Sequence, residues 1–320
     1  MNDIPSAPRS LIWANLIHLS YNMWSDWENP AIAAAAPYNA AKPYLRFDDG
    51  LWNDLLQRMS QTGFNMVVLD LGDGVRWESH PEIAVENAWT VERLREELAK
   101  MRSLGLEPIP KLNFSTCHDQ WMGPYARRIS TPEYYAFCHD LIAEVIALFD
   151  TPRFFHLGMD EEELKHQRHF EYVVLRQGDL WWRDFRLFVD QVESAGIKPW
   201  IWSDYVWEHP DLFWERMPRS VLQSNWYYGT DFGPNVREPR AYRELEQHGF
   251  DQIPTVSIYK SPENVAKTVQ FCRDHIAPER LKGFLLAPWK PTLEACRAHH
   301  LQAVETMGNV IRSTAEGSST

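Results

Sequence analysis

The chain alternates short apolar runs with longer stretches in which apolar residues recur at helical spacing. The apolar runs predict eight strands, over Leu11 to Leu19, Asn65 to Leu71, Glu107 to Phe114, Phe154 to Leu157, Lys198 to Ser203, Val221 to Trp226, Pro254 to Tyr259 and Gly283 to Ala287. The helical patterns cover Leu51 to Gln61, Val91 to Ser103, Pro132 to Phe149, Leu180 to Ser194, Pro239 to His248, Pro262 to His275 and Leu293 to Ile311. This alternation is typical of an α/β protein with parallel strands.

Eight βα units in 320 residues predict a single (β/α)8 TIM barrel over residues 1–312, with a disordered C-terminal tail at 313–320. A doubly wound open sheet is the alternative, but it would normally carry a glycine-rich phosphate loop after its first strand, and this sequence has none. The segment after the first strand, residues 22–50, is a long loop rich in alanine, proline and aromatic residues. Loops of this length in compact domains are usually functional, so we expect it to form a wall of the active site.

Barrel enzymes carry their chemistry where the strands end. The candidate site residues at these positions are His18, Asp70, Asn113, His118, His156, Asp160, Glu161, Trp202, Asp204, Trp226, Tyr259 and Trp289. Carboxylates suit acid/base work, amides bind hydroxyl groups, and indoles stack on sugar rings, so the set predicts a carbohydrate pocket. Some of these residues also have a structural explanation: Asp70 and Asn113 could cap helices, and Trp202 could lie in the core. Trp200 and Trp202 should point to the same side of their strand.

The stretch from Arg153 to Glu163 is the strongest single signal. Its apolar residues indicate a short buried strand that stops at Gly158 and is followed by an acidic cluster. Neighbouring residues on an extended backbone point in opposite directions, so Asp160 and Glu161 can serve two roles around one substrate. The alternative is an acidic first turn of the next helix, which compensates the helix dipole.

His156 is expected to orient its neighbours through a hydrogen bond. A metal site built from His118, His156 and Asp160 is the alternative, but no spacing such as HExxH supports it, and we expect neither a metal nor a cofactor.

The net charge of −12 argues against nucleic acid and anionic membrane as partners, because both would be repelled. The N-terminus shows no signal-peptide pattern, and no apolar run reaches the length of a membrane span. The four cysteines lack metal-ligand spacing and are interpreted as reduced thiols of a cytoplasmic protein.

Residues 156–162, HLGMDEE, resemble the His-x-Gly-Gly-Asp-Glu signature of family 20 glycoside hydrolases, the β-N-acetylhexosaminidases, in their compact single-domain form. Residues 63–83, 105–118, 200–228 and 283–289 are similar to other strand regions of that family, so the resemblance covers most of the chain.

The resemblance implies an exo-acting, retaining hydrolase of terminal β-linked N-acetylhexosamine or a modified hexosamine. Glu161 would be the general acid/base, and Asp160 would orient the 2-acetamido group, whose oxygen is the nucleophile of this substrate-assisted family. Tyr259 would bind the acetamido carbonyl, Trp202, Trp226 and Trp289 would surround it, and His118 would match a family histidine.

The sequence also departs from the family pattern. Met159 replaces the second glycine of the signature, and Thr116-Cys117 replaces the Pro-Gly that precedes the histidine. The first strand lacks the family's arginine, and Trp289 is followed by Lys290 and Pro291 instead of an acidic residue two positions later. These departures point to an unusual or modified sugar. Two other functions stay open: a two-carboxylate glycosidase that pairs Glu161 with Asp204 or Asp70, and a sugar-binding barrel without catalysis.

Overall fold

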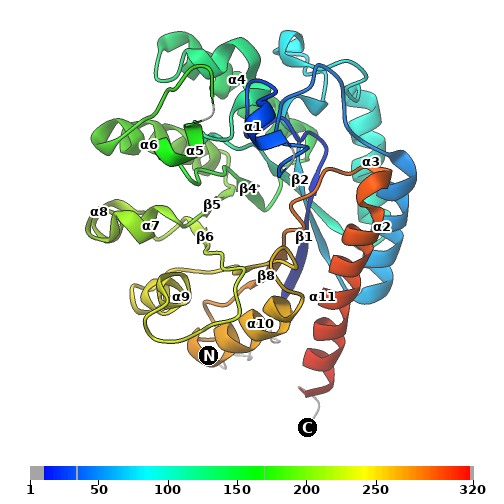
Figure 1. Ribbon diagram of the computed structural model, residues 1–320, viewed down its shortest axis with the longest axis vertical. Helices are drawn as coiled ribbons and strands as arrows, with labels where there is room; N and C mark the ends of the chain where they lie inside the picture. Colours follow the sequence, from blue (N-terminus) through cyan, green and yellow to red (C-terminus); the bar gives the residue numbers. More distant parts are fainter. Residues whose placement is uncertain (1–10, 34, 169, 318–320) are drawn as a thin grey trace, which may run out of the picture.

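Eight parallel strands form one curved sheet at the centre of the molecule, and helices surround it (Figure 1). The computed structural model describes residues 11–33, 35–168 and 170–317. The strands are β1 (Ile12–His18), β2 (Met66–Asp70), β3 (Glu107–Lys111), β4 (Phe154–His156), β5 (Lys198–Trp202), β6 (Leu222–Ser224), β7 (Thr255–Val256) and β8 (Gly283–Leu286).

The strand order is β6-β5-β4-β3-β2-β1-β8-β7, and bridges from Gln223 to Gln252 and from Trp226 to Thr255 join the two outer strands. The sheet is therefore nearly closed, and the predicted (β/α)8 TIM barrel is confirmed. Each strand lies inside the predicted apolar run and is often shorter than it, because the residues that follow leave the sheet to form the mouth of the barrel.

The seven long helices match the predicted ones to within a few residues. They are α2 (Asp49–Thr62), α3 (Val91–Ser103), α4 (Pro132–Leu148), α6 (Gly178–Ser194), α9 (Arg237–Gln247), α10 (Glu263–His275) and α11 (Arg297–Gly317). The sequence did not predict the shorter α1 (Pro30–Ala33), α5 (Leu164–Gln167), α7 (Tyr205–Glu208) and α8 (Pro210–Arg216), nor the 3₁₀ turns η1 (Gly72–Gly74), η2 (Pro81–Ile83), η3 (Gln120–Arg127) and η4 (Glu294–Cys296).

The predicted boundary between barrel and tail at residue 312 is too early. Helix α11 continues through the expected tail as far as Gly317, and residues 318–320 lie outside the described residues. Near the end of the helix the side chain of Ile311 is buried, and the Thr314 hydroxyl donates a hydrogen bond to the Val310 carbonyl oxygen at 2.8 Å. None of the described helices is long and apolar enough to cross a membrane.

Alternate strand residues build two cores. One cluster fills the barrel and includes Leu16, Val68, Ile109, Trp200 and Trp202. The other packs between the barrel and its helices. Trp200 and Trp202 therefore both point inward, as the spacing of two predicted.

A polar layer lies at the upper end of the barrel interior, and strand register produces it. His18 pairs with Asp70, Asp70 with Lys111, and Lys111 with His156 across consecutive strands. All four side chains point inward from positions at the carboxyl ends of their strands, and all four are buried. The residues that follow these positions form the floor and walls of the mouth.

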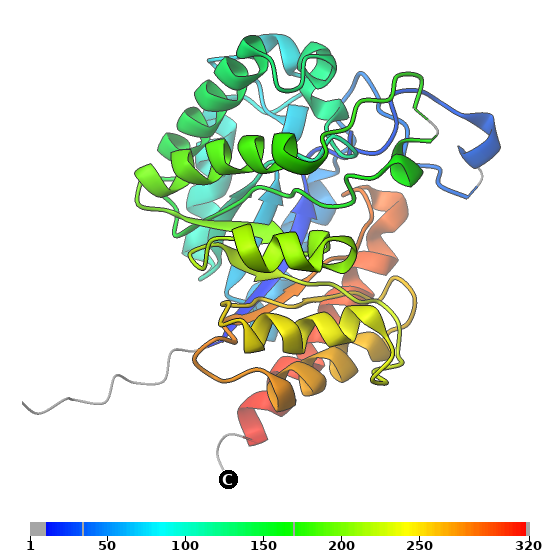
Figure 2. The same ribbon diagram turned by 90° about the vertical axis from the view of Figure 1, so that its left-hand side faces the viewer.

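The segment between β1 and α2 projects beyond the carboxyl ends of the strands, with α1 near its tip (Figure 2). Arg46 joins the two ends of this segment: its guanidinium donates to the carbonyl oxygens of Tyr38 and Tyr21 and to Oδ1 of Asn22, at 2.7, 3.0 and 2.9 Å. The start and the end of the long loop are thus held together beside the mouth.

Candidate active site

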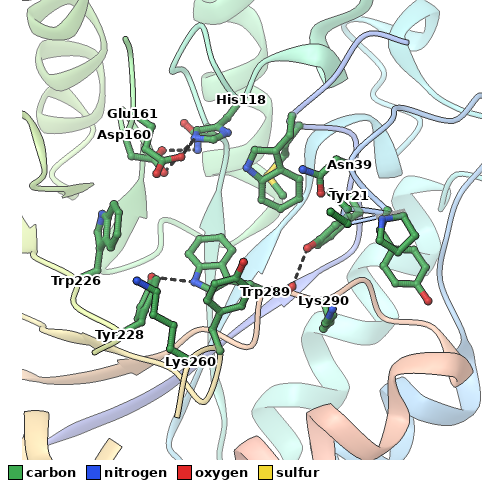
Figure 3. Close-up of a pocket in the computed structure, with 18 residues that line it drawn as sticks. Tyr21, Asn39, His118, Asp160, Glu161, Trp226, Tyr228, Lys260, Trp289 and Lys290 are labelled. Atoms are coloured by element: carbon green, nitrogen blue, oxygen red, sulfur yellow. Dashed lines mark hydrogen bonds and ion pairs between the residues drawn. The ribbon is translucent and has the colours of Figure 1, made fainter. Parts of the chain in front are cut away.

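A pocket of about 340 Å³ opens at the carboxyl ends of the strands (Figure 3). Its lining comprises Tyr21, Met23, Trp24, Ala35, Ala36, Pro37, Tyr38, Asn39, Asn113, His118, Asp160, Glu161, Trp226, Tyr228, Tyr259, Lys260, Trp289 and Lys290. Residues 21–39 supply eight of these, so the long loop walls the pocket, as its length predicted.

Asp160 and Glu161 follow β4 on a turn with left-handed backbone. The φ angles of Gly158, Met159 and Glu161 are 71°, 74° and 56°, and non-glycine residues adopt such values rarely. The pair is therefore not extended, and the expectation that its side chains point in opposite directions is wrong. Both carboxyl groups approach one imidazole: Nε2 of His118 lies 3.3 Å from Oδ2 of Asp160 and 3.3 Å from Oε2 of Glu161.

Asn113, on the segment after β3, organises this turn. Its Nδ2 donates to Oδ1 of Asp160 at 2.8 Å, and its Oδ1 accepts from the backbone N–H groups of Ser115 and Met159 at 3.1 Å each. A Cβ at position 158 would lie 2.0 Å from Oδ1 of Asn113, so only glycine fits there.

The two carboxyl groups set the charge of His118. Burial by itself lowers the pKa of His118, but Asp160 and Glu161 outweigh it and raise this pKa to about 10. Burial likewise raises the pKa of Asp160, and the His118 imidazolium, Lys111 and Asn113 reverse that effect and hold it well below its usual range. The site therefore contains an ionised Asp160 and an imidazolium, both almost fully buried.

The Glu161 side chain is the more open of the pair, at 24% exposure against 9% for Asp160. Nδ1 of His166 lies 3.5 Å from its Oε2. A substrate in the pocket can thus contact Glu161 from the solvent side while Asp160 stays fixed in its buried network.

Asp204 lies behind the pair and outside the pocket lining. Its Oδ2 accepts from the backbone N–H of Glu161 at 2.8 Å, and its Oδ1 accepts from the Trp226 indole at 3.4 Å. Burial, with the charge of Asp160, raises the pKa of Asp204 to about 8. This carboxyl group therefore supports the Glu161 turn from its position outside the pocket lining.

His18, Asp70 and His156 belong to the polar layer beneath the pocket and do not line it. Asp70 accepts from Nζ of Lys111 at 2.6 Å and contacts Nδ1 of His18 at 3.1 Å. His156 accepts the backbone N–H of Gly158 on Nδ1 at 3.1 Å, so it orients the catalytic turn, as expected. The sequence analysis missed Lys111, the cation of this layer, because it stands two positions before Asn113, the polar residue taken from this strand end.

Aromatic side chains form the wall across from the carboxyl groups. The Trp226 ring stacks on the Tyr228 ring at 5.3 Å, and the Trp289 indole N–H donates to the Tyr228 hydroxyl at 2.8 Å. Trp289 has a left-handed φ of 53°, and its carbonyl oxygen accepts from the Tyr21 hydroxyl at 2.9 Å. Trp202 lies beneath Trp289, with ring centroids 5.8 Å apart, and supports this wall from the barrel interior.

Tyr228 is a site residue that the sequence analysis missed. It is partly buried in the pocket lining, and burial raises its pKa well above the usual value, so the phenol keeps its proton. Tyr259, the expected partner of the acetamido carbonyl, lies at the rim and is 58% exposed. In the run NWYY, Trp226 and Tyr228 stand two positions apart, and this repeat was the available signal for Tyr228.

His118, Asp160 and Glu161 also place one ligand atom each within 4.8 Å of one another. The two carboxylates that raise the pKa of His118 would also attract a metal cation, which would have to displace the proton of the imidazolium. His156, a member of the alternative metal set, does not belong to this group.

No protein-family model and no curated protein matches the sequence. Solved structures do match. The β-N-acetylhexosaminidase from Bacteroides fragilis has a TM-score of 0.62 at 13% identity over 98% of this chain and 71% of that one. The chain has the fold of the family 20 hexosaminidases.

The N-acetyl-β-hexosaminidase from Streptomyces plicatus gives a TM-score of 0.64 at 14% identity, over 94% of this chain and 64% of its own. Dispersin B matches over 94% of this chain and 99% of its own, with a TM-score of 0.55 at 14% identity. The resemblance noted in the sequence is thus confirmed for the fold, and it includes a compact protein of similar length.

Proposed function

We propose that this protein is a retaining, exo-acting glycoside hydrolase that removes a terminal β-linked N-acetylhexosamine or a modified hexosamine. The observation that carries the proposal is the pocket itself: Asp160 and Glu161 meet at His118 on one side, and an aromatic wall faces them. The similar structures support the substrate class, since those from Streptomyces plicatus and Vibrio harveyi were determined with N-acetylglucosamine.

In this proposal the acetamido group of the bound sugar is the nucleophile. Its carbonyl oxygen attacks C1 while Glu161 donates a proton to the departing glycosidic oxygen, and the C1–O bond breaks. Water then attacks C1 of the oxazolinium intermediate and gives its proton to Glu161, which restores the enzyme with retained configuration.

Asp160 would accept the acetamido N–H and hold the group in line with C1. Its negative charge is secured by His118 and Asn113, and it would stabilise the positive charge that develops on the oxazolinium. The Tyr228 hydroxyl accepts from Trp289 and still has its own proton to donate, so it is placed to bind the acetamido carbonyl.

The two-carboxylate alternative receives less support. Asp204 is bound to the Glu161 backbone and has a raised pKa, and Asp70 lies beneath the pocket in contact with Lys111. Neither carboxyl group lines the pocket. Asp204→Asn should therefore retain most activity, whereas the loss of a nucleophile would abolish it.

The testing experiment compares aryl β-glycosides with and without the 2-acetamido group. The unmodified enzyme should hydrolyse the N-acetylglucosaminide or N-acetylgalactosaminide and leave the glucoside nearly untouched. Asp160→Ala should raise the barrier by about 3 to 4 kcal/mol for every leaving group, the cost typical of removing one preorganised electrostatic group. Equal turnover of the glucoside and the acetamido sugar would overturn the proposal.

Leaving-group dependence separates the role of Glu161 from that of Asp160. Glu161→Gln should slow substrates with poor leaving groups much more than activated aryl glycosides, because the latter depart without a proton. If Glu161→Gln slowed both kinds of substrate equally, Glu161 would not be the general acid. If no acetamido sugar were hydrolysed but one still bound, the sugar-binding alternative would replace the enzyme.

A further inference from the structure

Two lysines line the pocket without an acidic partner. The chain has nine lysines. Seven of them form ion pairs with Asp or Glu side chains: Lys42, Lys100, Lys111, Lys165, Lys198, Lys267 and Lys282. Among the described residues no carboxylate pairs with Lys260 or Lys290, and both lie in the pocket lining.

The two lysines follow two neighbouring strands in the same arrangement. The chain leaves β7 through Tyr259-Lys260 and leaves β8 through Trp289-Lys290, so each strand delivers an aromatic residue followed by a lysine to the same mouth. Figure 3 shows both lysines on the side of the pocket away from Asp160 and Glu161. The Nζ of Lys290 lies 5.9 Å from the ring centre of Tyr38, on the loop wall.

The net negative charge of the protein makes these two lysines informative about the charge of the ligand. A protein with a net charge of −12 repels anions at long range, so an anionic ligand needs local cations in order to bind. The carboxyl pair contacts His118 and forms no ion pair with either lysine. A lysine ammonium binds sulfate, phosphate or carboxylate as a compact point charge.

We propose that Lys260 and Lys290 bind an anionic substituent of the sugar in the pocket, so that the substrate is an acidic N-acetylhexosamine. This inference rests on the proposed function for the identity of the sugar and goes beyond it by naming the charged group. The substituent lies on the part of the sugar remote from the scissile bond, because the lysines lie opposite the carboxyl pair.

Binding tests the anion site independently of turnover. Glu161→Gln protein is titrated calorimetrically with N-acetylglucosamine, its 6-sulfate, its 6-phosphate and N-acetylmuramic acid, which separate sulfate, phosphate and carboxylate as the source of the charge. At least one acidic sugar should bind roughly tenfold to a hundredfold more tightly than the neutral one, as expected for charge-assisted hydrogen bonds. Added sodium chloride should reduce this preference. Equal binding of neutral and acidic sugars would overturn the proposal.

Variants test whether Lys260 and Lys290 cause the preference for the acidic sugar. In the Lys260→Gln/Lys290→Gln double variant the preference for the acidic sugar over the neutral one should fall by roughly tenfold or more. Lys267→Gln, which removes an exposed lysine paired with Glu263 on α10, is the control and should keep the preference. A preference that survived in the double variant would remove the two lysines from the site.

Kinetics then separates this inference from the proposed function. Methylumbelliferyl N-acetylglucosaminide and its 6-sulfated form are compared in the unmodified enzyme. Hydrolysis of both, with no preference in the binding experiment, would refute the anion site alone. A lysine-dependent binding preference without hydrolysis of either substrate would refute the proposed activity and leave the anion site standing.

Discussion

Two clusters of similar residues lie one above the other at the end of the barrel. The lower one joins Asp70 to Lys111 and His18, and the upper one joins Asp160 and Glu161 to His118. In the lower cluster one carboxylate meets one ammonium, and burial holds the pKa of His18 below its usual value, so the charges balance inside the protein. In the upper cluster two carboxyl groups share one imidazolium, and only this cluster reaches the pocket.

Residue type and strand-end position therefore do not by themselves define a site. A carboxylate becomes available for chemistry where its charge is incompletely matched and the pocket reaches it. The lower cluster should therefore affect stability, and the upper cluster should affect activity as well as stability; each expectation can be tested.

The largest effect is expected at Asp70. Asp70→Asn leaves the buried ammonium of Lys111 without its charge partner, which should lower the free energy of unfolding by about 3 to 5 kcal/mol. Urea unfolding followed by circular dichroism measures this change. Asp49→Asn removes an exposed ion pair with Arg93 and should cost less than about 1 kcal/mol. Equal costs for the two variants would show that the lower cluster is not structural.

His118 should give the upper cluster a pH signature. Its pKa rises from 6.5 to about 10 on folding, so its stabilising contribution is complete below pH 6.5 and is lost as the pH rises through 10. The stability difference between the unmodified protein and His118→Gln should thus shrink by about 1.4 kcal/mol per pH unit across this window. Urea unfolding at several pH values measures it.

The same comparison, with and without His118→Gln, is repeated in the Asp160→Asn protein. Removing the main carboxylate partner of His118 should narrow the pH range over which the stability difference falls, because the imidazolium then relies on Glu161 alone. A stability difference that did not vary with pH would mean that His118 is not held as an imidazolium.

A smaller effect is expected at Gly158, where the upper cluster depends on backbone geometry. Gly158→Ala drives a Cβ into Asn113 and should displace Asp160, at a cost of about 1 to 3 kcal/mol in stability with a clear loss of kcat/KM. Gly105→Ala is the control, because its φ of 75° is similar and no atom lies within 4 Å of the added Cβ. Full activity in Gly158→Ala would show that the turn tolerates the shift.

The smallest effect concerns two tyrosines that differ in burial. Tyr228→Phe removes the hydroxyl that accepts from Trp289 and should lower kcat/KM roughly tenfold, equivalent to about 1 to 2 kcal/mol. Tyr259→Phe should have a smaller effect, because its side chain is 58% exposed. The reverse order would restore Tyr259 as the residue that binds the acetamido carbonyl.

The alternation of strands and helices could be predicted from the amino-acid sequence, because apolar periodicity is a local property of the chain. The sequence also placed Asp160 and Glu161 at a strand end and predicted that residues 22–50 would wall the pocket. The disordered tail was placed too early, since α11 continues to Gly317.

Which strand-end residues reach the pocket depends on the folded barrel and could not be predicted from the sequence. Register between neighbouring strands turned His18, Asp70 and His156 into the barrel interior, and a left-handed turn brought Asp160 and Glu161 to one imidazole. The positions of Tyr228, Lys260 and Lys290 in the pocket lining have the same origin. These contacts join residues far apart in the chain, and their geometry exists only once the barrel has closed.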